Sequence, residues 1–314
     1  MEGLLLFAVS LLSLGAIYAI LCLALNLEAG GAGLWDLGIV SFFGIGAYTY
    51  ALLTAPAAEP HQNYLLGLGL SPVVGLAGAA VTGAITALLI GLPTLRLKRE
   101  YFLITTLAFA EVLRQVFANE DWLTNGVAGI YGLEQPFRDV LTPSTLPYAF
   151  LVIILASLAI VYWLVAKVSG DGFGRALKAL RENEPLAMTA GIYPFSHYLR
   201  VFMLAGALSG VAGAYYVWYN TLVVPGQFSS NVTFFVWTAL IIGGLGNNRG
   251  ALVGGFLFVV MHDALRFIQA SSDMALFLSS LRTVMIGAAL ILILRFRPSG
   301  LLPERPARIA VGGR

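Results

Sequence analysis

Charged residues are scarce in this chain of 314 residues, of which only 11% are Asp, Glu, Lys or Arg. Soluble proteins average about 25% charged residues, so the composition argues against a soluble enzyme. The formal net charge is only +2, which is too small to indicate a nucleic-acid partner. Disorder is excluded as well, because 59% of the residues are hydrophobic, whereas disordered chains combine low hydrophobicity with high net charge.

Residues that bind metals or carry out catalysis are equally rare. The chain contains one cysteine, Cys22, and three histidines, so we expect no internal disulfide and no metal site. Phosphate-binding Gly-x-x-x-x-Gly-Lys-Ser/Thr, Gly-x-Ser-x-Gly, His-Glu-x-x-His and Gly-x-Gly-x-x-Gly motifs are all missing. We therefore predict no catalytic residues and no cofactor on this chain. If ATP drives the protein, another subunit must bind it.

Long hydrophobic segments are what the chain does contain. A helix needs about 20 apolar residues to cross the hydrocarbon core of a bilayer. Nine segments fit this requirement: 3–27, 37–55, 71–92, 101–118, 148–166, 201–219, 232–246, 251–267 and 281–294. The sequence therefore predicts an all-α, polytopic transmembrane helical bundle with about 8–10 spans.

Basic residues occur in every second connection between these segments. Thirteen of the 18 lysines and arginines follow this pattern: Arg96, Lys98, Arg99, Lys167, Arg175, Lys178, Arg181, Arg249, Arg295, Arg297, Arg305, Arg308 and Arg314. The opposite connections contain Arg138 among acidic residues such as Glu120 and Asp121. Because basic loops remain in the cytoplasm, we expect a cytoplasmic carboxyl terminus and an outer amino terminus.

Two glycine-rich stretches interrupt the apolar pattern. One includes Gly30 and Gly33 within residues 28–38, and the other includes Gly243 and Gly244 at the end of a short predicted span. Non-helical backbone survives at membrane depth only where it is buried in protein or lines a cavity, so such breaks often mark a transport path. A plain glycine turn between two helices is the alternative interpretation.

Three charged residues lie within or beside predicted spans. Glu111 and Arg114 are three residues apart and share one helical face, where they form either a structural ion pair facing the bundle or part of a polar lining or gate. Asp36 precedes the second span and either faces the path or caps the helix that follows. The chain has no run of central acids of the kind expected in a proton-driven carrier.

The connection 167–198 predicts two short helices joined at a corner. Apolar residues recur at helical spacing in the first helix, with charged residues on its other side. Asn183 or Glu184 caps the second helix, Pro185 lies in its first turn, and Gly191 ends it. An amphipathic helix of this kind rests on lipid headgroups or presents a rigid surface to a cytoplasmic protein. We favour the protein partner, because the second helix is nearly uncharged.

Several motifs resemble those of the branched-chain amino acid permease family of ATP-binding-cassette (ABC) importers, LivM type, and they occur together in one chain. Residues 184–191 are similar to the Glu-Ala-Ala…Gly loop of such permeases, although Pro185 breaks that order. The similarity extends over residues 20–302 and rests mainly on segments 42–48, 92–97, 174–184, 243–246 and 297–301.

The resemblance implies a permease subunit that moves Leu, Ile, Val or a similar small polar solute across a prokaryotic plasma (inner) membrane by alternating access. Its implied partners are a second homologous permease, two cytoplasmic ATP-binding subunits that hold ATP-Mg, and an extracytoplasmic solute-binding protein. Two transmembrane halves, 1–166 and 199–297, flank the coupling loop 167–198, with a cytoplasmic tail at 298–314. The residues expected to couple this subunit to the ATPases are Arg175, Lys178, Arg181, Glu182, Glu184 and Gly191.

Alternatives to this function remain open from the sequence. Related permeases carry urea and short amides, so the solute is not determined by this chain. A secondary carrier driven by an ion gradient belongs to a different class, and the scarcity of central acids argues against it. A membrane-embedded enzyme is disfavoured because no catalytic constellation is visible.

Overall fold

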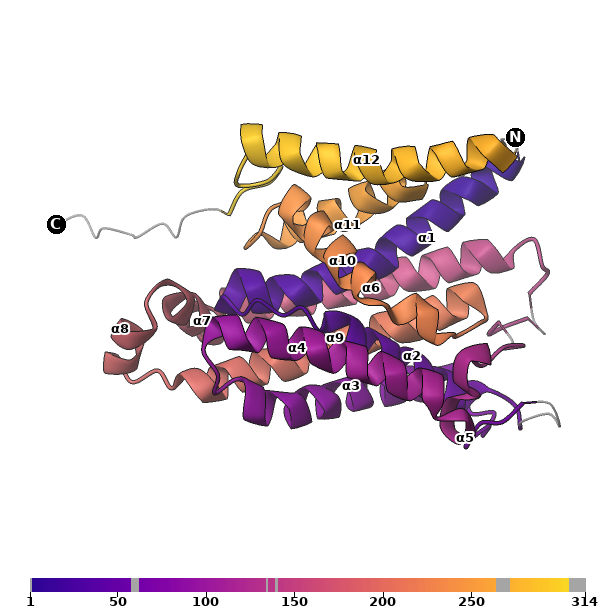
Figure 1. The fold of residues 1–314 in the computed structure, drawn as a ribbon, viewed down its shortest axis with the longest axis horizontal. Helices are drawn as coiled ribbons and strands as arrows, with labels where there is room; N and C mark the ends of the chain where they lie inside the picture. The colour runs from indigo at the N-terminus through magenta and orange to yellow at the C-terminus, as the bar shows by residue number, and fades with distance from the viewer. Residues whose placement is uncertain (1, 58–61, 134, 139–140, 264–271, 305–314) are drawn as a thin grey trace.

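The computed structural model describes residues 2–57, 62–133, 135–138, 141–263 and 272–304 (Figure 1). The long helices are α1 (Glu2–Leu25), α2 (Ile39–Thr54), α3 (Pro72–Thr94), α4 (Arg99–Asn119), α6 (Leu146–Gly170), α9 (Pro194–Asn220), α10 (Ser230–Gly243), α11 (Asn248–Asp263) and α12 (Ser272–Phe296). The shorter elements are the π-helix η1 (Asn26–Ala32), α5 (Asp121–Thr124), α7 (Gly172–Glu182), α8 (Glu184–Thr189) and the 3-10 turns η2 (Gly126–Ala128) and η3 (Pro225–Phe228). The all-α prediction is confirmed, since strand pairing in these ranges is limited to two isolated bridges.

Each of the nine predicted spans coincides with one of the long helices. Residues 264–267, at the end of one predicted span, and tail residues 305–314 lie outside the described residues. Five of the described helices are long and apolar enough to cross a membrane: α1 with its π-helical extension, α3, α4, α6 and α9. α2, α10 and the described apolar part of α12 are shorter.

Helix α10 is short. With 14 residues it extends about 21 Å at 1.5 Å per residue, less than the roughly 30 Å of a bilayer core. Helix α11 is described from Asn248 to Asp263. Gly244 and Gly246 have positive φ angles and form the connection between the two helices. The predicted short, interrupted span is thus a short helix that ends in a glycine turn, after which α11 begins.

Helix α9 lies at the centre of the bundle. It packs against α1, α2 and α3, and most of its apolar length is buried inside the protein. In Figure 1 the long helices run roughly along the length of the molecule, with α7 and α8 at one end and the amino terminus at the other. The carboxyl-terminal end of α12 lies at the same end as α7 and α8.

Small residues permit the close contact between α9 and its neighbours. A Cβ atom added at Gly210 would lie 2.2 Å from the carbonyl oxygen of Ala79 in α3, and one added at Gly46 in α2 would lie 2.3 Å from Gly210 Cα. Helix interfaces in membranes depend on such small residues, because apolar side chains gain little by leaving lipid for protein. The glycine spacing at Gly206 and Gly210 therefore lets three helices approach at one level.

Replacement of Gly210 tests this contact. We expect Gly210→Ala to destabilise the protein by about 1–3 kcal/mol, because the added methyl group meets backbone that has no room to move. Gly287→Ala in α12 is the matched control, since a Cβ atom there meets nothing within 4 Å. Thermal unfolding in detergent measures both variants, and equal midpoints for the two would contradict the close contact.

Candidate coupling loop and translocation face

The coupling loop folds as the two predicted helices, α7 and α8. Leu177 and Leu180 of α7 are buried, and this helix packs against α6, α9 and η1. Its charged side carries Arg175, Lys178 and Arg181, the first of which donates to the carbonyl oxygen of Gly170 at 3.1 Å. The apolar side of α7 thus faces the helical bundle of this chain.

Helix α8 begins and ends as the sequence predicts. The Asn183 side chain accepts a hydrogen bond from the backbone N–H of Leu186 at 3.0 Å, which caps the first turn. Gly191, just beyond the last turn, has a φ of 81°, a value that L-residues rarely adopt. Glu184 accepts a hydrogen bond from the Tyr198 hydroxyl at 3.3 Å, whereas Glu182 is exposed. Both ends of α8 are therefore fixed in place.

The tip of the loop exposes apolar side chains to solvent. The exposed fractions are 66% for Leu186, 55% for Met188 and 77% for Tyr193. Ala187, between the first two, is buried against the rest of the loop. Exposed apolar groups on a capped, rigid helix are characteristic of a surface that docks into another protein.

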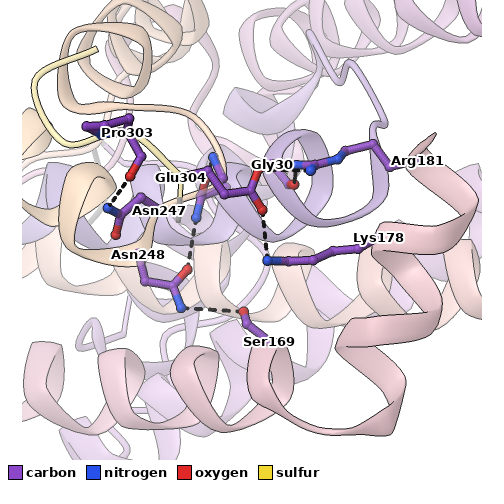
Figure 2. A network of polar contacts seen from close by, with 10 residues as sticks. Gly30, Ser169, Lys178, Arg181, Asn247, Asn248, Pro303 and Glu304 are labelled. Carbon is purple, nitrogen blue, oxygen red and sulfur yellow. Dashed lines mark hydrogen bonds and ion pairs between the residues drawn. The ribbon is translucent and has the colours of Figure 1, made fainter. Parts of the chain in front are cut away.

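Two of the basic residues on α7 reach a glutamate in the carboxyl-terminal segment. Lys178 Nζ lies 2.8 Å from Glu304 Oε1, and a terminal nitrogen of Arg181 lies 2.8 Å from Glu304 Oε2 (Figure 2). Arg181 also donates to the backbone carbonyl oxygen of Gly30 in η1. Glu304 could not be predicted as their partner, because nothing along the chain places residue 304 beside residues 178 and 181.

The two glycine-rich breaks lie against one another. A Cβ atom added at Gly30 would lie 2.6 Å from the backbone nitrogen of Gly246, and Asn26 accepts that same N–H at 2.8 Å. The Asn26 amide donates in turn to Asn248 at 2.9 Å. The breaks that the sequence placed in separate halves therefore form one contact, held together by the Asn26 side chain.

The other glycines of the breaks have distinct surroundings. Gly33 follows the π-helix with a φ of 71° and packs against the side chain of Arg181. Gly243 ends α10, and a Cβ atom there would lie 2.1 Å from the carbonyl oxygen of Gly250 in α11. Gly244 adopts a φ of 123°, which only glycine tolerates well. A cavity of about 640 Å³ opens beside these breaks and the first turns of α7.

Helix α4 exposes a polar face. Arg114 Nε donates to both carboxylate oxygens of Glu111, at 3.1 and 3.0 Å, so the predicted ion pair is present. The two side chains are 27% and 46% exposed, and the pair therefore lies on the outer surface of this chain instead of facing its bundle. Gln115 and Asn119, which the sequence analysis did not single out, are exposed on the same helix.

Asp36 is completely buried. One of its carboxylate oxygens accepts the N–H of Gly38 at 2.7 Å, directly before α2, and its backbone carbonyl accepts a hydrogen bond from the Trp237 indole at 2.8 Å. The carboxylate thus closes a local turn directly before α2. The capping interpretation is wrong, since no side chain caps the first turn of that helix. Trp237 also stacks on Trp35, with ring centroids 5.3 Å apart.

Glu28 is a buried acid that the sequence analysis missed. Its side chain has 0% exposure and lies beside that of Asp36. Within the described part of the chain, the only group placed to share a hydrogen bond with its two oxygens is the Asp36 carboxyl. A carboxyl group in such surroundings is expensive and, at membrane depth, commonly marks a functional position. The sequence signal was weak, because a single glutamate at the end of an apolar segment is also typical of a residue that lies at the membrane–water interface.

The described residues thus form a polytopic helical bundle with two short helices, α7 and α8, between the long helices α6 and α9. Residues 7–294 match the family described as "Branched-chain amino acid transport system / permease component". The chain belongs to this family, which confirms the resemblance, and it is a transporter subunit and not an enzyme.

Individual relatives agree with this assignment. The chain is 29% identical to the high-affinity branched-chain amino acid transport system permease protein LivM of Salmonella typhimurium, over 94% of this chain and 70% of the relative. It is 27% identical to a probable branched-chain amino acid transport permease protein LivM of Methanocaldococcus jannaschii, over 92% and 91%. A nucleoside ABC transporter permease protein NupC of Lactococcus lactis is 26% identical over 72% and 71%. No solved structure matches the chain.

Two substitutions of Asp36 distinguish the contribution of its acceptor oxygen to stability from that of its negative charge. We expect Asp36→Ala to lower stability by about 1–3 kcal/mol, because the buried N–H of Gly38 loses its partner. Asp36→Asn keeps an acceptor oxygen in the same place and should lose less than half as much. Unfolding midpoints of the purified subunit in detergent distinguish the two, and equal losses would show that the charge, not the acceptor, matters.

Proposed function

We propose that this chain is one of the membrane-spanning subunits of an ABC importer for branched-chain amino acids. The observation that carries the proposal is the exposed apolar tip of α8, a helix whose first turn is capped by Asn183 and which lies at one end of the bundle. In this role the loop 167–198 docks into a cytoplasmic ATP-binding subunit. Because no phosphate-binding loop exists in the sequence, the ATP and Mg²⁺ belong to that partner.

The names of the relatives support the choice of solute. Two LivM proteins that align with more than nine-tenths of this chain are described as branched-chain amino acid transport permeases. Nucleosides are a second candidate class, favoured by the nucleoside permease that aligns with 72% of the chain. A solute-binding protein on the outer face delivers the solute and sets much of the selectivity in this scheme.

The polar face of α4 supports a second permease subunit. Charged and amide side chains are costly against lipid, so they face water or protein in membrane-spanning helices. Glu111, Arg114, Gln115 and Asn119 lie on the outer surface of this chain, where a partner subunit or a water-filled path removes them from lipid. We place the translocation path between this face and the second permease.

The orientation follows from the basic residues. Arg96 and Arg99 border one cavity with Glu184, and Arg249 borders another with Lys178, so basic residues from distant connections gather near α7 and α8. Basic residues remain on the cytoplasmic side, which favours a cytoplasmic coupling loop and carboxyl terminus. ATP-driven movement of the loop then reaches the breaks at Gly30 and Gly246 through Arg181 and alternates access to the path.

Charge at the tip of α8 tests the docking role. We expect Leu186→Asp with Met188→Asp to abolish ATP-dependent leucine uptake by proteoliposomes that contain the complete transporter, because carboxylates do not enter an apolar docking surface. Leu186→Met with Met188→Leu is the matched control and should keep most of the uptake. Both wild-type side chains are exposed, so folding of the subunit itself is preserved.

The same assay separates the alternatives to this function. Uptake of leucine, isoleucine and valine that requires ATP supports the proposal, whereas uptake of a nucleoside, urea or a short amide instead would reassign the solute. Uptake driven by a proton or sodium gradient without ATP would show a secondary carrier. Full ATP-dependent uptake by the Leu186→Asp, Met188→Asp variant would refute docking through α8.

Cysteine labelling tests the position of the path. Val112 of α4 and Val152 of α6 are 57% and 66% exposed. Val112 lies about two turns before the carboxyl-terminal end of α4, and Val152 lies about two turns after the amino-terminal end of α6. We expect Val112→Cys to react with a water-soluble maleimide and Val152→Cys, facing lipid, to react at least about tenfold more slowly, since thiolates form in water. The native Cys22 is buried and gives little background. Equal labelling of the two positions would contradict a path along α4.

A further inference from the structure

The carboxyl-terminal segment after α12 completes the end of another helix. The backbone N–H groups of Leu301 and Leu302 donate to the carbonyl oxygens of Ile242 and Gly243, each at 2.9 Å. These carbonyls belong to the last turn of α10, where a helix has no internal donors left for them. The segment therefore caps α10 from a distant part of the sequence.

The same segment is fixed to the glycine turn between α10 and α11. The Asn247 side chain donates to the carbonyl oxygen of Leu302 at 3.1 Å. It also donates to the carbonyl oxygen of Pro303 at 3.0 Å (Figure 2). A Cβ atom added at Gly300 would lie 2.5 Å from Gly244 Cα, so backbone packs directly on backbone. Residues 300–303 are thus fixed to this turn and should move with it.

Glu304, at the end of the segment, links the turn to the coupling loop. Its two oxygens receive one ion pair each, from Lys178 and from Arg181, as Figure 2 shows. The three side chains are 23–37% exposed, so water weakens the pairs but does not eliminate them. Without the carboxylate, two cations three residues apart on α7 would face each other.

A third segment joins the contact through Arg181. This side chain also donates to the carbonyl oxygen of Gly30, and its aliphatic part packs on Gly33. Glu304 itself approaches Gly246, where an added Cβ atom would lie 2.6 Å from its carboxylate oxygen. The Glu304 carboxylate therefore lies where α7, the π-helix η1 and the α10–α11 turn meet.

We propose that Glu304 is a positioning residue and that residues 300–304 form a strap, which carries displacement of α7 to the α10–α11 turn. The proposal rests on the proposed coupling function of the loop. When an ATPase partner moves α7, Lys178 and Arg181 pull on Glu304, and the tail pulls the carbonyl end of α10 with it. Without the strap, the partner still moves α7 and still hydrolyses ATP, but less of that movement reaches the glycine breaks.

The number of leucine molecules imported per ATP hydrolysed, measured in proteoliposomes with the complete transporter, tests the strap. We expect Glu304→Gln to lower this ratio about threefold and Glu304→Lys about tenfold or more, corresponding to roughly 0.7 and 1.4 kcal/mol of lost coupling. ATP hydrolysis itself should continue in both variants. Glu100→Gln, an exposed carboxylate at the start of α4, is the matched control and should leave the ratio unchanged.

Charge exchange distinguishes coupling from a purely structural role. Glu304→Lys combined with Lys178→Glu restores one ion pair with opposite polarity and should recover at least about half of the lost ratio, whereas Lys178→Glu alone should lower it. Wild-type uptake without any ATP dependence would refute the proposed function. ATP-dependent wild-type uptake together with an unchanged ratio in Glu304→Gln and Glu304→Lys would refute the strap alone.

Discussion

The hydrogen bonds of Asn26 hold the two breaks in the helices together, and much of the remaining structure depends on this contact. Backbone groups freed by a break at membrane depth have no water to bind, so protein must satisfy them. Asn26 accepts from Gly246 and donates to Asn248, which joins the end of α1 to the start of α11. Glycine at positions 30 and 246 leaves room for the two backbones to approach.

This central contact lies directly beside the coupling loop. Arg181 extends from α7 to Gly30, so the loop that is expected to meet the ATPase reaches the breaks through one side chain. The buried pair Glu28 and Asp36 lies a few residues further along the same segment. The loop, the π-helix and the glycine turn thus lie where basic residues from several connections gather.

The sequence predicted the elements well, because each is governed by local physics. The apolar segments gave all nine long helices, and the turn residues Asn183 and Gly191 marked the ends of α8. The ion pair of Glu111 and Arg114 followed from helical spacing, yet its direction was wrong in the bundle-facing interpretation. Spacing shows which residues share a face of a helix but not what that face contacts. In α4 the face with Glu111 and Arg114 lies on the outer surface of the chain.

By itself the sequence determined the class of protein and the positions of its helices, including the two short helices within residues 167–198, because hydropathy and capping act over short stretches of chain. Tertiary structure alone decided that Gly30 meets Gly246, that Glu28 lies beside Asp36, and that Glu304 meets Lys178 and Arg181. Each of these contacts joins segments that no local rule relates. They form because helices that exclude lipid from their interface bring distant breaks to one place, where buried polar groups must find partners among themselves.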